Sequence, residues 1–399
     1  MSGTLLNSDL NSFCQKYLVT NNGNQNVSVA CFVEDEKRIS SSIFEQMLLF
    51  ESVCFKVHGE NIPLIVLLNK FGVSGFESLL EQGAVTFVLW NQMISHMVDD
   101  IPGLDPLQYG TYSSKAHYDP EESIELSFAW MKEPIKRSTK RGLVRKVRDH
   151  YSLPKPDVSK EAVNLVRSAY DSGKLATYGL GPDKSDYANL NLSNRKLLCS
   201  CADELLQYVH LLNEQMTTYD KLSYYQMFVD SGKKISVGLN LAEKYQALSE
   251  LQDVPDLRSL YAELEKPYER LIKVRAKERS KKFRRWLMEQ AGNEGAEDIS
   301  REYIEAIANA KGFFQTRMGK FSKAVAMTTI GGGIGALLAG PIGAAGGATA
   351  ARILEPVTDL GLDLIDEFVV SGLTKGWTPK MFFDDIESLR KENLKRNLG

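Results

Sequence analysis

The feature that most constrains this chain is residues 324–351, a long stretch without a single charge that reads AVAMTTIGGGIGALLAGPIGAAGGATAA. Small residues recur at every fourth position, in a register that includes Gly331, Gly335, Gly343 and Gly347. On a helix this spacing gathers them on one face, where a second backbone can approach closely. We therefore predict a Gly/Ala zipper, in which helical segments pack backbone to backbone.

The composition of this stretch limits how the zipper is used. Its only Ile and Leu residues are Ile330, Ile334, Leu337, Leu338 and Ile342, which is little apolar surface for insertion into a membrane. Gly340-Pro341 interrupts the helix and leaves arms of about 14 residues, roughly 21 Å each, against a hydrocarbon core of about 30 Å. We expect a helical hairpin buried in a soluble domain, and a conditional membrane element is the alternative.

One formal cofactor motif lies inside the zipper. Gly331, Gly333 and Ala336 match the dinucleotide-binding pattern G-x-G-x-x-[G/A]. That pattern binds a cofactor between a strand and further βαβ units, whereas a long helical pattern precedes it here. The chain also has no G-x-S-x-G, H-E-x-x-H or P-loop pattern. The motifs therefore predict no catalytic residue, no metal ligand and no cofactor.

Residues 1–150 are expected to form an α+β domain. Apolar or alternating patterns of half-buried strands occur in four segments, namely residues 27–33, 47–57, 84–90 and 123–130. Between the second and third of these, Asn61 caps one predicted helix, and a capping box that begins at Ser74 opens another. The expected domain therefore mixes strands with short helices.

Residues 157–399 are expected to form a mainly α-helical domain that contains the zipper hairpin. Its first long helix carries an apolar stripe at spacings of three and four, made of Leu198, Cys201, Leu205, Val209, Leu212 and Met216. A loop over residues 174–193 is longer than is usual inside a compact domain, and prolines at 154 and 156 precede it. These breaks place the domain boundary in this part of the chain.

Three segments resemble members of a group of uncharacterised bacterial proteins. The segments read GENIPLIVLLNKFG (59–72), LLEQGAVTFVLW (79–90) and GLTKGWTPKMFFDD (372–385), so the resemblance spans both ends of the chain. It implies a bacterial origin, and it brings no activity, cofactor or substrate with it.

Two basic runs are candidates for binding an anionic surface. The first covers residues 132–148. The second is made of Lys273, Arg275, Lys277, Arg279, Lys281, Lys282, Arg284 and Arg285, with Glu278 as the single opposing charge. Basic residues around a narrow apolar stripe suit a nucleic-acid backbone, lipid headgroups or an acidic partner. Ion pairing with the acidic C-terminal part of the chain is the structural alternative for the second run.

An acidic loop over residues 99–122 is a candidate metal site. It carries Asp99, Asp100, Asp105, His117, Asp119, Glu121 and Glu122 among prolines and glycines, and such oxygen ligands suit a divalent ion. No ligand spacing defines a site, so solvation of an exposed loop explains these charges equally well. The other histidines (His58, His96, His150 and His210) are expected to lie singly, each with its hydrogen bonds satisfied.

Charge and cysteine content favour a cytoplasmic protein. Peripheral or conditional association with the inner membrane is compatible with this location. The net charge of −3 gives no global attraction to nucleic acid, and the five cysteines lack C-x-x-C spacing. We expect a non-catalytic interaction or effector protein that is built around the zipper, with conditional membrane activity as an addition, and that binds a protein partner or self-associates. A nucleic-acid-binding protein and a metal-dependent hydrolase are the alternatives, and the sequence identifies no small-molecule substrate.

Overall fold

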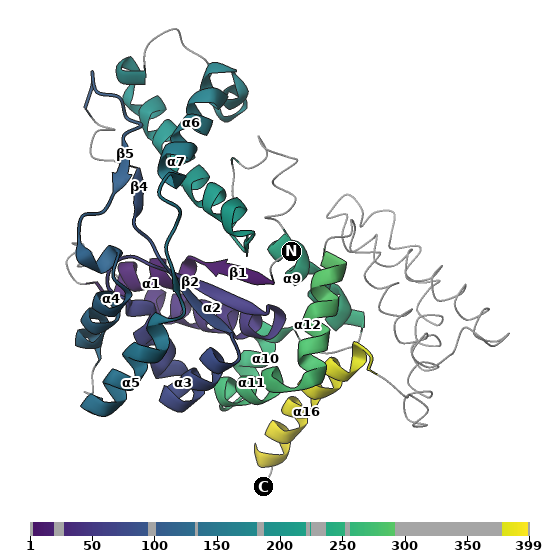
Figure 1. Ribbon diagram of the computed structural model, residues 1–399. Coiled ribbons are helices and arrows are strands. Elements are labelled where there is room, and N and C mark those ends of the chain that lie inside the picture. Colours follow the sequence, from purple (N-terminus) through teal and green to yellow (C-terminus); the bar gives the residue numbers. More distant parts are fainter. Residues whose placement is uncertain are drawn as a thin grey trace, which may run out of the picture. The chain divides into compact units, whose positions relative to one another are not determined.

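The computed structural model describes residues 3–19, 28–94, 101–131, 135–181, 187–220, 224, 237–251, 256–291 and 377–397. The chain forms two compact units, residues 1–238 and 239–399 (Figure 1). The predicted zipper over residues 324–351, with Gly331, Gly335, Gly343 and Gly347, lies outside the described residues.

A parallel sheet of five strands forms the centre of the first unit. In chain order its strands are β1 (Thr4–Asn7), β2 (Ser52–Val57), β3 (Val85–Leu89), β6 (Tyr151–Ser152) and β7 (Thr217–Thr218). Their order across the sheet is β6-β3-β2-β1-β7, and every neighbouring pair is parallel. A separate antiparallel ribbon joins β4 (Gln92–Ile94) to β5 (Tyr109–Thr111).

Both faces of this sheet are buried, as is typical of parallel sheets. Leu6, Cys54 and Val88 belong to one core cluster with residues of α6 (Val158–Asp171) and α7 (Leu192–Glu214). The alternate strand residues Val53 and Phe55 are also fully buried, and they face the other way because strand side chains alternate. The helices α1 (Asp9–Tyr17), α2 (Val29–Leu49) and α3 (Ile62–Glu81) pack against the strands.

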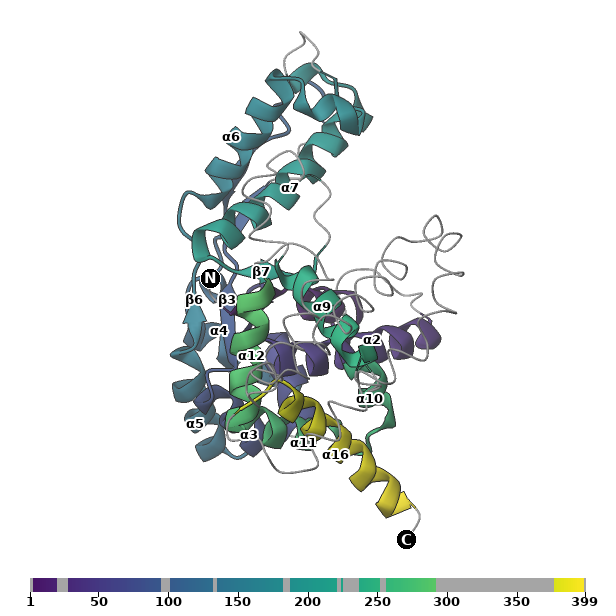
Figure 2. The same cartoon turned by 90° about the vertical axis from the view of Figure 1, so that its right-hand side faces the viewer.

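The remaining helices of the first unit follow β5. They are α4 (Pro120–Ser127) and α5 (Arg137–Arg148), with the short 3₁₀ helices η3 (Lys115–His117), η4 (Phe128–Trp130), η5 (Lys174–Tyr178) and η6 (Tyr187–Asn189). The two long helices α6 and α7 lie side by side as a pair (Figures 1 and 2). The C-terminal end of α7 leads directly into β7, so this pair connects β6 to β7.

Helix α3 confirms two sequence predictions. Asn61 is its N-cap, since its side-chain Oδ1 accepts a hydrogen bond from Leu64 N at 2.9 Å. Gly72 has a non-helical backbone with φ of 68°, so α3 consists of two helical segments joined by a kink. By length and composition α3 is apolar enough to cross a membrane, but half of its apolar window is buried inside the unit. A core helix passes the same test, so this is weak support for a membrane span.

The N-terminal region is an α/β fold and not the expected α+β fold. The predicted strands at 47–57 and 84–90 form β2 and β3, but 27–33 enters α2 and 123–130 lies in α4 and η4. Ser28 Oγ caps α2 by accepting from Ala30 N at 3.2 Å, and Asp119 caps α4. Because helices replace these strands, the chain alternates between strands and helices and the sheet becomes parallel.

The first compact unit also extends beyond the expected boundary at 150–157. Helices α6 and α7, expected to open the helical domain, belong to the first unit because β7 follows them and pairs with β1. The apolar stripe predicted on α7 is confirmed, since Leu198, Cys201, Leu205 and Val209 are all buried.

The described part of the second unit is helical. Its helices are α9 (Val237–Leu251), α10 (Leu257–Glu263), α11 (Pro267–Ala276), α12 (Glu278–Ala291) and α16 (Lys380–Asn397). Aromatic rings hold α9, α12 and α16 together, with Phe283 stacked on Phe382 at 4.1 Å and Tyr245 stacked on Phe383 at 5.7 Å. A mostly helical remainder of the chain is therefore confirmed.

Candidate functional site

A pocket of about 460 Å³ lies at the carboxyl ends of the parallel strands in the first unit. Lys56 is near the end of β2 and His58 follows that strand, while Trp90 follows β3 and Asp220 follows β7. Other lining residues come from the β4–β5 ribbon and from α7, namely Gln92, Met93, Ile94, Tyr112, Asp203, Glu204, Leu206 and Gln207. Open parallel sheets bind their ligands at this edge.

The strand order explains why the pocket forms here. After β1 the chain builds β2, β3 and β6 on one side, and it then returns to place β7 on the other side of β1. This reversal of direction at β1 is the switch point of the sheet, the position at which open α/β sheets have a crevice. Ser8 and Asp220 follow β1 and β7 and join across the crevice, since Ser8 Oγ donates to Asp220 Oδ2 at 2.7 Å.

Asp220 is held in place by three hydrogen bonds. Its Oδ2 also accepts from Gln207 Nε2 of α7, and its backbone N–H donates to Thr218 Oγ1 at 3.1 Å. Both side-chain bonds reach the same oxygen. Within the described part of the chain, the other carboxylate oxygen, Oδ1, has no hydrogen-bond partner. Asp220 is therefore positioned by the protein and still has one oxygen for a ligand.

Five aromatic and imidazole rings contact one another in series beside the pocket. His117 stacks on Tyr112 with ring centroids 4.4 Å apart, and Tyr112 meets His58 edge to face at 6.0 Å. His58 lies 6.4 Å from Trp90, whose ring meets that of His210 at 5.2 Å and 86°. We call these residues the ring wall. Three of the five histidines in the chain belong to it.

Lys56 is a half-buried cation against the ring wall. Its Nζ lies 4.0 Å from the centroid of the Trp90 ring, a cation–π contact. Among the described residues it makes no hydrogen bond and no ion pair. Burial lowers the pKa of Lys56 to about 8, although the charges of Asp220 and Asp203 oppose this shift. A substantial fraction of this amine is therefore neutral near physiological pH.

The histidines of the ring wall are neutral at pH 7. Burial lowers the pKa of His58 to about 3, and the nearby charge of Lys56 adds to this effect. Burial also lowers the pKa of His210 to about 4, again with a contribution from Lys56. Burial and the charge of Asp203 raise the pKa of Tyr112, so its hydroxyl stays protonated. Lys56 is thus flanked by neutral rings.

Several polar groups of the pocket have unused hydrogen-bonding capacity within the described part of the chain. These groups are Lys56 Nζ, the His58 ring, the Tyr112 hydroxyl, Gln207 Oε1 and Asp220 Oδ1. A few polar groups that converge on one concave pocket are characteristic of a binding site.

Sequence reasoning missed this site and treated its histidines as isolated, satisfied residues. That expectation is wrong for His210, because both of its ring nitrogens are buried without a partner among the described residues. His58 and His210, which are scattered singly in the sequence, both contact Trp90 in the fold. A usable signal was present in Lys56 and His58, two polar residues at alternate positions where an apolar strand ends.

The second basic run is largely engaged inside the second unit. Arg275 and Arg284 are buried, and Arg284 Nη2 donates to the Arg275 carbonyl at 3.2 Å. Lys277 and Arg279 both pair with the buried carboxylate of Asp385, and Lys281 pairs with Glu278 at 2.7 Å. The exposed members without an ion pair in the described residues are Lys273, Lys282 and Arg285.

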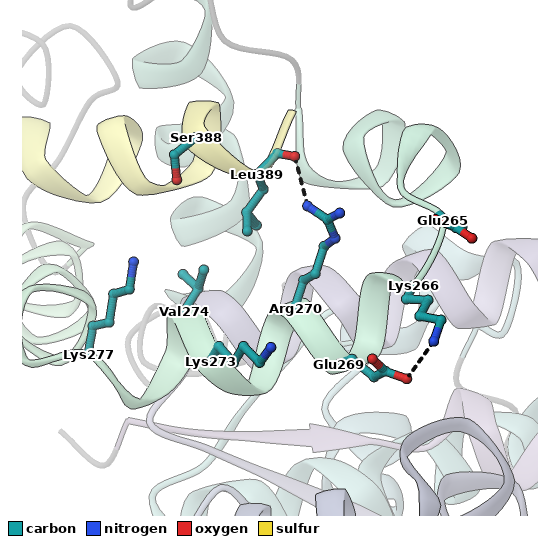
Figure 3. Close-up of a pocket in the computed structure, with 9 residues that line it drawn as sticks. All are labelled: Glu265, Lys266, Glu269, Arg270, Lys273, Val274, Lys277, Ser388 and Leu389. Atoms are coloured by element: carbon teal, nitrogen blue, oxygen red, sulfur yellow. Dashed lines mark hydrogen bonds and ion pairs between the residues drawn. The ribbon is translucent and has the colours of Figure 1, made fainter. Parts of the chain in front are cut away.

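A smaller pocket of about 290 Å³ lies beside this run, between α11 and α16 (Figure 3). Arg270 Nη1 donates to the Leu389 carbonyl at 3.0 Å, and Lys266 pairs with Glu269 at 3.5 Å. Lys273 and Lys277 complete its cationic lining. Most of these cations thus serve contacts within the unit.

Residues 135–148 of the first basic run are described, and most of them belong to α5. Lys146 pairs with Glu77 at 3.0 Å and Arg148 pairs with Glu121. Arg137, Arg141 and Arg145 are exposed and have no ion pair among the described residues. Because they are spaced by four, they form one stripe along α5, opposite the buried Leu143 and Val147.

The carboxylates of the acidic loop that the structure describes have structural roles. Asp105 pairs with Arg167 at 2.6 Å, and Asp119 caps α4. Lys115 pairs with Glu122 at 3.3 Å, and Glu121 is the partner of Arg148. His117 belongs to the ring wall, while Asp99 and Asp100 lie outside the described residues. In the described ranges no group of three His, Cys, Asp or Glu residues is placed to hold a metal ion.

Fold and pocket together define a class of protein unit, a parallel α/β sheet that is covered on both faces and has a pocket at the carboxyl ends of its strands. No protein-family model, curated protein or solved structure matches the chain. The resemblance to uncharacterised bacterial proteins therefore stays a prediction.

Proposed function

We propose that the first unit binds a small, hydroxyl-rich ligand of low net charge, such as a sugar or the sugar part of a nucleoside. The observation that carries this proposal is the convergence of five polar groups, without hydrogen-bond partners among the described residues, on one pocket of about 460 Å³ at the switch point of a parallel sheet. A pocket of this size accommodates a ligand of a few hundred daltons at most.

The chemistry of the lining favours hydroxyl groups. Asp220 Oδ1 and Gln207 Oε1 accept hydrogen bonds, and the His58 ring and the Tyr112 hydroxyl are able both to donate and to accept. The ring wall offers apolar surface for the carbon skeleton of the ligand. Hydroxyls both donate and accept, so a polyol satisfies such a mixed set better than a purely anionic or purely cationic ligand.

The charges of the pocket argue against a phosphorylated ligand. Its lining includes three carboxylates, Asp203, Glu204 and Asp220, against the single cation Lys56. The turn after β1 reads Asn7-Ser8-Asp9 and lacks the glycines that bring backbone N–H groups to a phosphate. A nucleotide would therefore face repulsion without a phosphate cradle.

Calorimetric titration of the full chain with D-ribose, ribitol, adenosine and AMP tests this proposal. We expect at least one uncharged polyol or nucleoside to bind, and AMP to bind less tightly than adenosine. Asp220→Asn removes a charged acceptor, which is worth about 1.5–3 kcal/mol, so affinity should fall by roughly 10-fold or more. Asp171→Asn is the matched control, since Asp171 bonds Tyr187 away from the pocket. Equal affinity for the wild type and Asp220→Asn, or no binding at all, overturns the proposal.

A nucleic-acid-binding role is a second candidate, and one specific observation favours it. Arg137, Arg141 and Arg145 present three cations along one exposed face of α5 without ion pairs in the described residues. Phosphate contacts by Lys and Arg supply most of the affinity of non-specific nucleic-acid binding. This stripe suits that role better than the run at 273–285, most of which is engaged internally.

The membrane-directed effector role expected from the zipper stays a prediction, because residues 324–351 lie outside the described residues. The same holds for the predicted cytoplasmic location. The acidic loop gives little support to a metal-dependent hydrolase, because its described carboxylates cap a helix or pair with cations.

A further inference from the structure

Lys56 differs from Lys16, Lys70 and Lys115, three other lysines of the first unit, in how its charge is stabilised. Lys16, Lys70 and Lys115 are all paired with carboxylates, at 2.9, 2.5 and 3.2 Å. Lys56 has no such partner among the described residues, and its Nζ rests on the face of Trp90 inside the pocket. The protein therefore places an amine at a ligand site without stabilising its protonated form by a direct ion pair.

The surroundings of Lys56 favour its neutral form. Burial lowers the pKa of Lys56 to about 8 against the opposing charges of Asp220 and Asp203, so roughly one-tenth of the amine is unprotonated at pH 7, against about 0.04% for an ordinary lysine. A desolvated lysine in a partly apolar pocket is one of the established ways to make a nitrogen nucleophile. The cavity beside it leaves room for a reacting carbon.

We propose that the Lys56 amine forms an imine with the carbonyl carbon of a hydroxyl-bearing aldehyde or ketone, such as an open-chain aldose, bound in this pocket. The inference rests on the proposed function, because the same pocket must first hold the polyol chain. It adds a covalent step at a named atom to the binding of the ligand.

The step balances without an oxidant or a metal. The lone pair of Nζ attacks the carbonyl carbon to form a C–N bond, and the C=O π pair moves to oxygen, which takes a proton from the Tyr112 hydroxyl. The positively charged nitrogen then passes one proton to Asp220 Oδ1, which carries no hydrogen bond in the described part of the chain, and a neutral carbinolamine results. Asp220 gives this proton to the hydroxyl, which leaves as water as the nitrogen lone pair forms the C=N bond. The protonated imine then returns its remaining N–H proton to the Tyr112 phenolate. One amine and one carbonyl thus give one imine and one water.

Reductive trapping tests this inference on the full chain. The protein is incubated at pH 7 with D-ribose and sodium cyanoborohydride, and the modification of each lysine is followed by peptide mass mapping. We expect Lys56 to react at least about 10-fold faster than Lys16, Lys70 and Lys115 in the same sample, which serve as internal controls. The rate at Lys56 should saturate with ribose and rise with pH to a midpoint near 8.

Competition with ribitol separates a bound intermediate from chance glycation. Ribitol has the hydroxyls of ribose but no carbonyl, so it should protect Lys56 and leave the control lysines unaffected. Lys56→Met should abolish trapping at this position and leave the rates at Lys16, Lys70 and Lys115 unchanged, and urea denaturation shows that the variant is folded. Ribitol binding without faster, saturable trapping at Lys56 overturns the imine and leaves the ligand-binding proposal intact. If the wild-type chain neither binds ribitol nor shows faster trapping at Lys56, the imine and the ligand-binding proposal are both overturned.

Discussion

His210 is fully buried on α7, and neither of its ring nitrogens has a hydrogen-bond partner among the described residues. Its ring packs edge to face on Trp90, which also carries Lys56 on its face. A buried imidazole without partners is tolerated only in its neutral form, because a buried charge without a partner is far more costly. The residue therefore links the ring wall to the stability of the first unit.

Protonation of His210 should destabilise the protein in acid. Its pKa is about 4 when folded and about 6.5 when unfolded, so the unfolded chain binds the proton more readily between these values. Stability from this residue is complete above pH 6.5 and is lost as pH falls toward 4, by about 2 kcal/mol at pH 5. Urea denaturation at pH 7.5 and pH 5 measures it, and the loss should shrink in His210→Leu. An unchanged loss in that variant contradicts the assignment.

At the scale of single elements, the sequence predicted those helices and strands whose position is determined by a local pattern of residues. β2 and β3 follow from apolar alternation, and the start of α3 follows from the cap at Asn61. The two-residue strands β6 and β7 have no local signal, because only pairing with β3 and β1 makes them strands. For residues 123–130 the sequence does contain a helix signal, because Asp119 is a capping residue and Pro120 follows it at the first helical position.

Asn61 offers a sharp test of one such element. Its Oδ1 caps α3 at Leu64 N, and its Nδ2 donates to the hydroxyl of Tyr151 on β6. Asn61→Ala removes the cap and leaves a buried hydroxyl without this partner, so we expect a loss of about 2–3 kcal/mol in unfolding free energy. Asn61→Asp keeps the cap acceptor and should retain part of this stability. Chemical denaturation measures both, and a loss below about 0.5 kcal/mol for Asn61→Ala contradicts the role.

Helix α5 carries the test of the nucleic-acid alternative. If Arg137, Arg141 and Arg145 contact three phosphates, the slope of log K against log salt should be roughly −2.7, and their joint replacement by Ala should abolish binding. Engagement of all eight cations of the second run would give a slope of roughly −7 instead. Filter binding at several salt concentrations measures the slope, with the triple Ala variant of Lys273, Lys282 and Arg285 as control. Salt-independent or absent binding ends this alternative.

At the scale of the whole molecule, the pocket depends on topology that no local pattern encodes. Ser8, Lys56, Trp90 and Asp220 are far apart in sequence and meet because four parallel strands end at the same edge. The sequence predicted an α+β domain that ends at residue 150. Strand β7 and Asp220 lie beyond that boundary, so the predicted domain contains no switch point. The expectation of a non-catalytic protein rested on the absence of sequence motifs. If Lys56 is reactive as proposed, that expectation does not hold for the first unit.

A crystal structure of the full chain grown with ribitol tests the central claim most directly. The account predicts ribitol in the pocket beside Trp90 and Tyr112, with its hydroxyls donating to Asp220 Oδ1 and Gln207 Oε1. Ribitol bound only elsewhere, or this pocket filled by side chains of the protein itself, would contradict the claim that the carboxyl edge of the sheet is a ligand site.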